Sequence, residues 1–268
     1  ERPMRIPVLA ALALLAGPAL AQPAATPAAE GALTPAQRGE VIGILREALR
    51  SDPSILGEAL RANPLVLRDA FEALREAETR DRDGAARAAI AQHNDALFRD
   101  PADPVRGNPG APITLVEFFD VRCPYCKQLH LAMGDLVRRN PDVRVVLKDL
   151  PVLGPNSVLA ARALLAAQRQ GKYEALHGAL LRLREDPTEP VIRREAEKAG
   201  LDWPRLRREM DDPGIAARIA ANRRLAEALR LEGTPAVVVG ETLIPGAVDL
   251  ATLERLVGEQ RERARRGG

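Results

Sequence analysis

The stretch FFDVRCPYCKQLH, residues 118–130, holds both cysteines of this 268-residue chain, separated by only two residues. It overlaps an apolar run, ITLVEFFDV (113–121), which has the composition of a buried strand. Because proline is favoured at the first position of a helix, Pro124 predicts that a helix begins there and continues to about Arg139. We therefore expect Cys123 to lie where a strand passes into a helix.

The spacing of the two cysteines predicts different roles for them. A thiolate at Cys123 would face unpaired backbone N–H groups and the positive end of the helix dipole. Such thiolates attack disulfides, and a second thiol one turn along can release the mixed disulfide. We predict that Cys123 is the nucleophile, that Cys126 is the more buried resolving thiol, and that Pro124 and Tyr125 tune the pair.

The cysteine pair could have two other uses. A structural disulfide closing a four-residue loop would constrain the unfolded chain least, and a chain of this length would need more than one pair. Cys123, Cys126 and His130 could instead bind Cu(I), so a copper-binding or copper-tolerance protein is the alternative function. A structural zinc site normally needs four ligands, whereas His93 and His177 lie in separate helical segments. Redox chemistry is favoured, no metal ligands are assigned, and His130 is expected to be a partly exposed helix residue.

The first residues have the pattern of an export signal. In MRIPVLAALALLAGPALA (4–21), Arg5 precedes an apolar core and a small-x-small cleavage site, so we predict a signal peptide over residues 1–21 and a periplasmic location. Cysteines can persist there as a disulfide. The Ala/Pro-rich residues 22–33 are expected to form a disordered linker. The net charge is +2 and the charges are interspersed, which disfavours a nucleic-acid partner.

Residues 34–99 are predicted to form an all-α N-terminal arm. Thr34-Pro35, Asp52-Pro53 and Asn63-Pro64 each place a capping residue before a proline at a helix start. The helices carry apolar stripes, which either pack on the rest of the chain or meet copies of themselves in an oligomer. The charged segment 76–87 has few apolar side chains to bury against the rest of the chain. This favours the hypothesis that the arm is an oligomerisation region.

The remaining chain alternates strands and helices. A strand, a helix and a second strand in that order imply a right-handed crossover with parallel pairing. The predicted architecture is α/β, with the order βαβ, a helical insertion, then ββα. The predicted segments are a linker (100–112), the catalytic domain (113–265), its second strand (143–148), the insertion (156–232), a hairpin (236–240 and 242–246) and a closing helix (249 to about 263).

With Cys-Pro-Tyr-Cys inside βαβ…ββα, the chain resembles the thioredoxin fold. The motif EFFD-x-x-C-P-x-C, followed by a long helical insertion, is similar to the DsbA family of exported thiol-disulfide oxidoreductases. The resemblance covers residues 105–262, including LPVLGPNS (150–157) and GTPAVVVG (233–240). Residues 34 to about 75 resemble the N-terminal region of the suppressor-of-copper-sensitivity C proteins, a branch that includes trimeric disulfide isomerases.

The resemblance implies roles for further residues. Thr234-Pro235 matches the substrate-binding loop whose proline is cis and faces the disulfide. Glu117 matches a buried acid on the first strand that takes or relays the Cys126 proton, and Lys148 is a possible partner for it across the sheet. Tyr125 stands where DsbA itself has a histidine, which makes a milder redox potential plausible.

The resemblance also implies partners and cofactors. The substrates would be cysteine-containing secreted proteins, and a membrane or soluble redox partner would reset the cysteine pair. The protein would be a homo-oligomer, with a trimer favoured, and it would need no cofactor beyond the two thiols. Whether it acts as an oxidase or an isomerase is left open by the sequence.

Overall fold

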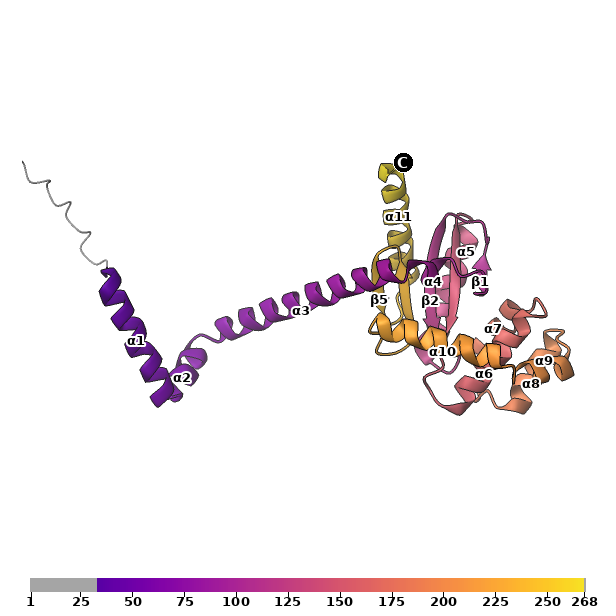
Figure 1. Cartoon of the computed structure of the whole chain (residues 1–268), viewed down its shortest axis with the longest axis horizontal. Coiled ribbons are helices and arrows are strands. Elements are labelled where there is room, and N and C mark those ends of the chain that lie inside the picture. Colours follow the sequence, from indigo (N-terminus) through magenta and orange to yellow (C-terminus); the bar gives the residue numbers. More distant parts are fainter. Residues whose placement is uncertain (1–32, 268) are drawn as a thin grey trace, which may run out of the picture. The chain divides into compact units, whose positions relative to one another are not determined.

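The computed structural model describes residues 33–267, and these divide into two compact units, one ending at Ala70 and one beginning at Phe71. The predicted signal peptide and most of the linker that follows it lie outside the described residues. The first unit contains α1 (Pro35–Ser51), α2 (Ser54–Ala62) and the start of α3 (Pro64–Gln92). The second unit (Figure 1) begins with the rest of α3. Its further elements are α4 (Asn94–Phe98), β1 (Val105–Gly107), β2 (Ile113–Phe119), α5 (Pro124–Arg139), β3 (Val143–Asp149), α6 (Pro155–Gln168), α7 (Tyr173–Leu181), α8 (Glu189–Lys198), α9 (Trp203–Glu209), α10 (Pro213–Ala228), β4 (Ala236–Val239), β5 (Thr242–Pro245) and α11 (Leu250–Gly267).

Helix α1 begins as its capping residue predicts, whereas α2 begins at Ser54, one residue later than the Asp52-Pro53 pair predicts. Thr34 caps α1 in a reciprocal capping box: its side chain accepts a hydrogen bond from the Gln37 backbone N–H, and the Gln37 side chain accepts one from the Thr34 N–H. α1 and α2 contain no buried residue. Their large apolar side chains are exposed, and these are Val41, Ile42, Ile44, Leu45, Leu49, Ile55 and Leu56.

The second unit is built on a five-stranded mixed sheet in the order β1-β3-β2-β4-β5. β2 and β3 are parallel, with α5 between them in the chain, as predicted from the order of elements. β4 and β5 form the predicted antiparallel hairpin, and β4 pairs with β2. The thioredoxin-like fold with a helical insertion is thereby confirmed.

The two faces of the sheet have separate apolar cores. One face packs Leu115 and Phe119 of β2 against α5, α11 and the insertion helices. The other face packs Val116 and Phe118 against the end of α3, α4 and the C-terminal part of α10. Because side chains alternate along a strand, consecutive residues of β2 enter different cores.

More of the chain before β2 belongs to the second unit than the sequence predicted. Ile90 and Leu97, which we placed in the arm, are buried in the second core. β1, which lies in the predicted linker, pairs antiparallel with β3. The boundary between the units, at Ala70 and Phe71, therefore differs from the predicted end of the arm at residue 99.

Candidate active site

Cys123 lies at the N-terminus of α5, as the position of Pro124 predicts. It is the N-cap residue, with an extended backbone, and Pro124 occupies the first turn. Its backbone N–H donates to the Asp120 carbonyl oxygen at 3.0 Å. The thiol is therefore placed at the positive end of a 16-residue helix, where an anion is stabilised.

The two thiols are free and differ in their surroundings. Cys126 is completely buried, and its sulfur accepts a hydrogen bond from the Asp120 N–H at 3.5 Å. Burial raises the pKa of the Cys126 thiol well above its ordinary value. Cys123 is 5% exposed, which is less than we expected for an attacking thiol. The predicted order of burial is correct, and of the two cysteines only Cys123 has any exposed surface.

The loop before β4 contacts the Cys123 sulfur directly. The Cys123 thiol donates to the Thr234 carbonyl oxygen at 3.2 Å. The Thr234–Pro235 peptide bond is cis, as the resemblance implied. The Thr234–Pro235 segment thus lies against Cys123 although it is more than a hundred positions away in the chain.

Glu117 is buried on the β2 face that packs against α5. Its Oε1 atom has no hydrogen-bond partner among residues 33–267. Burial raises the pKa of this carboxyl to about 7, against the opposing charge of Arg106. The Glu117 charge in turn contributes to the raised pKa of Cys126. The carboxyl therefore acts electrostatically on the Cys126 thiol and can accept a proton near neutral pH.

The proposed partner of Glu117 was wrong. In the parallel register Glu117 lies opposite Leu147, so Lys148 points to the other face of the sheet. The Lys148 ammonium instead forms a buried ion pair with Asp103 and donates to the Ala96 carbonyl oxygen. This ion pair connects the segment before β1 to β3. Among residues 33–267, Glu117 then has no cationic partner in direct contact.

Two histidines, His130 of α5 and His177 of α7, contact each other, contrary to our expectation. His130 is buried, not partly exposed, because Arg106 covers it with Nη1 3.2 Å from its Nδ1 atom. His177 of α7 is also buried, and the two ring centroids are 5.2 Å apart. Burial lowers the pKa of His130 to about 4 and also lowers that of His177. Both rings are therefore neutral at physiological pH.

Sequence reasoning missed this cluster because its members come from separate elements. The His177 ring also packs edge-on against Phe119 and is stacked on Tyr173. The only local signal was that His130 follows Cys126 by four residues, which places both on one face of a helix. Within the part of the chain that the structure describes, no group of three or more His, Cys, Asp and Glu side chains could hold a metal ion.

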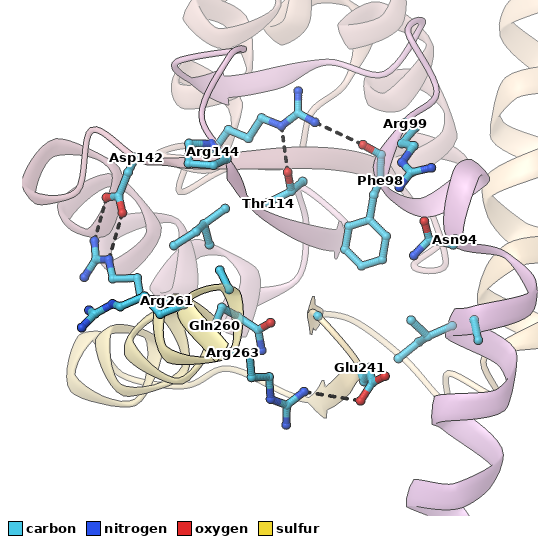
Figure 2. A pocket seen from close by; sticks show the side chains of 17 residues that line it. Asn94, Phe98, Arg99, Thr114, Asp142, Arg144, Glu241, Gln260, Arg261 and Arg263 are labelled. Atoms are coloured by element: carbon cyan, nitrogen blue, oxygen red, sulfur yellow. Dashed lines mark hydrogen bonds and ion pairs between the residues drawn. The ribbon is translucent and has the colours of Figure 1, made fainter. Parts of the chain in front are cut away.

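A cavity of about 750 Å³ lies away from the cysteines, among α3, α4, α11 and the ends of the strands. Figure 2 shows interactions of three of its arginines: Arg144 contacts Thr114 and Phe98, Arg261 pairs with Asp142, and Arg263 pairs with Glu241. None of the predicted site residues lines it. We assign no chemistry to this cavity.

The fold and the thiol pair agree with a comparison to known families. A model of the DSBA-like thioredoxin domain matches residues 114–258, more than half of the chain. The protein therefore belongs to the DSBA-like thioredoxin family, a class whose characterised members include thiol-disulfide oxidoreductases.

Within this family the chain is similar to the ScsC-like branch. Proteus mirabilis ScsC in a transitional conformation is 31% identical, and the match covers 88% of this chain and 100% of that one with a TM-score of 0.62. A thioredoxin-like oxidoreductase from Silicibacter pomeroyi DSS-3 is 44% identical over 63% of this chain and 97% of that one, with a TM-score of 0.61. The thiol-disulfide exchange protein alpha-DsbA2 from Wolbachia pipientis is 28% identical over 67% and 98%, with a TM-score of 0.64.

The curated relatives are longer proteins that are named as Na(+)/H(+) antiporters. Na(+)/H(+) antiporter NhaA 3 from Salinispora tropica is 34% identical over 163 residues, which are 59% of this chain and 25% of that protein. The chain thus spans about a quarter of the length of the curated relatives it matches. Among the helices of residues 33–267, none has the length and apolar character that a membrane crossing requires.

Proposed function

We propose that this protein exchanges disulfides with the cysteines of other exported proteins through Cys123 and Cys126. One observation carries the proposal. The Cys123 sulfur lies at the N-terminus of α5 and 3.2 Å from the Thr234 carbonyl oxygen, while Cys126 is enclosed behind it. This arrangement gives one thiol for attack and one for release, which is what a two-step exchange requires.

In the reducing direction, the Cys123 thiolate attacks a substrate disulfide and expels one substrate sulfur as a thiolate. The Cys126 thiol then passes its proton to Glu117 and attacks the Cys123 sulfur. The second substrate thiolate leaves, so the substrate gains two electrons and the cysteine pair loses two. Oxidation is the reverse sequence, and a substrate thiol that attacks the mixed disulfide instead gives isomerisation.

Thr234 and Pro235 are the proposed contact with the substrate backbone. The Thr234 carbonyl oxygen already accepts a hydrogen bond from the reactive thiol, so a polypeptide joined to Cys123 must pass beside it. Because the cysteine pair stores the two electrons, the proposal includes no further cofactor. A membrane or soluble redox partner would reset the pair.

The proposed location is the periplasm. It is supported by the signal-peptide pattern over residues 4–21 and by the chemistry, since a disulfide persists in an oxidising compartment. Fractionation of cells that make the full-length precursor tests it. Recovery of processed protein in the periplasmic fraction is expected, and unprocessed protein in the cytoplasm would contradict the proposal.

We also propose that the protein forms a homo-oligomer, with a trimer favoured, through its N-terminal helices. The support is the set of exposed apolar side chains on α1 and α2, which form no core of their own. Contiguous apolar surface that is left exposed marks a site of interaction with a partner. Light scattering of the intact protein measures the state directly, and a monomeric mass would overturn this part of the proposal.

The alternative of a copper-binding protein gains no support from the site geometry. His130, the third ligand that the sequence suggested, is engaged by Arg106. Anaerobic Cu(I) titration of the wild type and of the His130→Ala variant distinguishes the two functions. Tight stoichiometric binding without any disulfide-exchange activity would favour the alternative.

The main test is the reactivation of a scrambled, disulfide-bonded ribonuclease, with insulin reduction as a second assay. We expect the wild-type protein to accelerate at least one of the two reactions. The Cys123→Ser variant should have no activity, while Leu131→Ser, which changes an exposed side chain on the same helix, serves as the matched control. Equal rates for wild type and Cys123→Ser would reject the proposed function.

A further inference from the structure

Arg106 of β1 is a cationic side chain on the same face of the sheet as Glu117. It lies opposite Val145 of β3, which in turn lies opposite Leu115 of β2. Cross-strand partners point to one face, and so do residues two apart on a strand, so Arg106, Leu115 and Glu117 share a face. With strands about 4.8 Å apart and a rise of about 3.3 Å per residue, the Cα atoms of Arg106 and Glu117 are roughly 12 Å apart.

The Arg106 guanidinium is fixed by contacts with two helices that cover this face. Its Nη1 atom donates to the His130 carbonyl oxygen at 3.2 Å and lies 3.2 Å from His130 Nδ1. Its Nε atom is 3.2 Å from a carboxylate oxygen of Glu174, and only 14% of the arginine side chain is exposed. On α5, a Cβ atom at Gly134 would lie 2.8 Å from Nη2, so the glycine leaves the room that the guanidinium occupies.

Among residues 33–267, Arg106 is the one cation whose charge acts on the Glu117 carboxyl. A guanidinium can only donate hydrogen bonds, so His130 Nδ1 accepts and the His130 ring is neutral. The charge of Arg182 acts on His130. The elements around β2 also present Cys123, Cys126, the neutral His177, the exposed Glu174, and Tyr173, whose hydroxyl donates to Asp149. On β4 and α11 they present the apolar side chains Val237, Leu253, Leu256 and Val257.

A buried carboxyl needs a nearby opposite charge in order to ionise near neutral pH. Burial raises the pKa of Glu117 to about 7, and the charge of Arg106 acts against this rise. Without the cation, the carboxyl would keep its proton to a higher pH. A protonated carboxyl cannot accept the proton of Cys126, so the charge on β1 affects the step that Cys126 carries out.

We propose that Arg106 is a positioning residue for the resolving step, and that its charge keeps Glu117 ionised so that the carboxylate can take the proton of Cys126. The Cys126 thiolate then attacks the Cys123 sulfur, the bond from Cys123 to the substrate sulfur breaks, and the substrate leaves as a thiolate. The sequence suggested Lys148 as the partner of Glu117, whereas Arg106 acts on it through space and from another strand. The inference rests on the proposed function.

The test is the reaction of the reduced, full-length protein with 5,5′-dithiobis(2-nitrobenzoate), followed by stopped flow from about pH 5.5 to about pH 9. Attack by Cys123 releases the first thionitrobenzoate at a rate that depends on the reagent concentration, and attack by Cys126 releases the second at a rate that does not. In Arg106→Met, the pH midpoint of the second phase should rise by about one unit, because the charges lie roughly 10 Å apart at an effective dielectric constant of about 20. At about pH 6 the second phase should be about tenfold slower, while the first should change less than about twofold.

Three further variants separate the charge of Arg106 from its packing. Arg106→Lys keeps a positive charge and should recover at least about half of the change in midpoint. Glu174→Gln removes the exposed carboxylate that partly offsets the guanidinium, so its midpoint should move in the opposite direction, to lower pH. The matched control is Glu259→Gln, an exposed glutamate that pairs with Arg255 on α11, and it should leave both phases unchanged. In the Glu117→Gln background, Arg106→Met should not move the midpoint.

Two results for Arg106→Met would overturn the inference: an unchanged midpoint, including an equal slowing of both phases, or a change in midpoint that persists without the Glu117 carboxyl. If Arg106→Met does not fold, Glu174→Gln decides the question, and a midpoint that stays or rises there would reject the role of Arg106. Failure of the proposed function is distinguishable from these results, because the wild-type protein would then show no first phase that depends on Cys123.

Discussion

The sulfur of Cys123 lies 3.2 Å from the carbonyl oxygen of Thr234, so the thiol at the start of α5 contacts the loop before β4. Cys126, one turn further along the helix, is closed off from solvent. In the proposed exchange, a substrate sulfur therefore reaches the pair through Cys123, beside the Thr234–Pro235 loop. The order of the two chemical steps follows from this difference.

The Cys126→Ser variant is expected to accumulate mixed disulfides between Cys123 and substrate proteins, because the group that releases them is gone. Non-reducing electrophoresis and mass spectrometry of the adducts measure this. The Cys123→Ser variant is the control and should form none, because the buried Cys126 cannot be reached. Adducts at Cys126 in that control would contradict the assignment.

The Glu117→Gln variant should change how stability depends on pH. The pKa of Glu117 is raised from 4.5 to about 7 in the folded protein, so the folded state holds a proton that the unfolded state loses. Stability from this group is present below pH 4.5 and is lost as the pH rises to 7 and above. At about 1.36 kcal/mol per pKa unit, the loss amounts to about 3 kcal/mol.

Denaturant unfolding at several pH values between about 4.5 and 8 measures this effect. The difference in unfolding free energy between Glu117→Gln and wild type should grow in favour of the variant across that window. Asp149, whose pKa burial also raises to about 7, acts in the same direction in both proteins and cancels in the difference. Glu241→Gln changes an exposed carboxylate and is the control; an equal trend there would refute the prediction.

The His177→Phe variant is expected to be more stable than wild type by about 1 kcal/mol, because a buried unsatisfied polar group costs about 1–3 kcal/mol. Neither nitrogen of His177 has a hydrogen-bond partner among the described residues. Phenylalanine keeps the contacts of the ring with Phe119 and Tyr173 but is slightly larger, which offsets part of the gain.

The same variant should also resist acid better. Burial lowers the pKa of His177 below 6.5, so the unfolded state binds the proton first and stability falls as the pH drops below about 6.5. Urea unfolding at about pH 7 and about pH 5 measures both effects. His130→Phe is the matched control, and it should destabilise because it removes a partner of Arg106. A His177→Phe protein less stable than wild type at both pH values would show that the ring nitrogens are satisfied.

Two truncations should separate the arm from the catalytic unit. A protein that begins at Phe71 is expected to remain folded, active toward small disulfides and monomeric. A protein that begins at Asp100 loses Ile90 and Leu97 from the second core and should be less stable by more than about 4 kcal/mol. Light scattering and thermal unfolding measure both, and equal stability of the two proteins would show that α4 adds nothing to the core.

The Tyr125→His variant is expected to make the cysteine pair more oxidising. The Tyr125 side chain is 64% exposed beside the thiols, so a histidine there can carry a positive charge that favours the Cys123 thiolate. A shift of about 30 mV corresponds to a tenfold change in the exchange equilibrium. Equilibration with glutathione buffers measures the potential of each protein. Tyr125→Phe is the control, and an equal shift in both variants would rule out the charge effect.

The local chain pattern was sufficient to predict the elements that carry the thiols. Three local signals predicted β2, α5 and β3 and the parallel order of the strands: an apolar run, a proline at the first helical position and a second apolar run. They could do so because each signal acts within a few residues. The different burial of Cys123 and Cys126 followed from their places in one helical turn. The hairpin of β4 and β5 was predicted on the same kind of signal.

The surroundings of the thiols were decided by contacts between distant segments. The register of β2 against β3 places Glu117 and Lys148 on different faces of the sheet. Lys148 forms its ion pair with Asp103 instead of with Glu117. The packing of α7 brought His177 to His130. Strand register and helix packing depend on which segments meet in space, and no pattern within either segment contains that information. The sequence by itself thus determined the positions of the two sulfur atoms on their helix. Only the tertiary structure determined which charged and polar groups surround them.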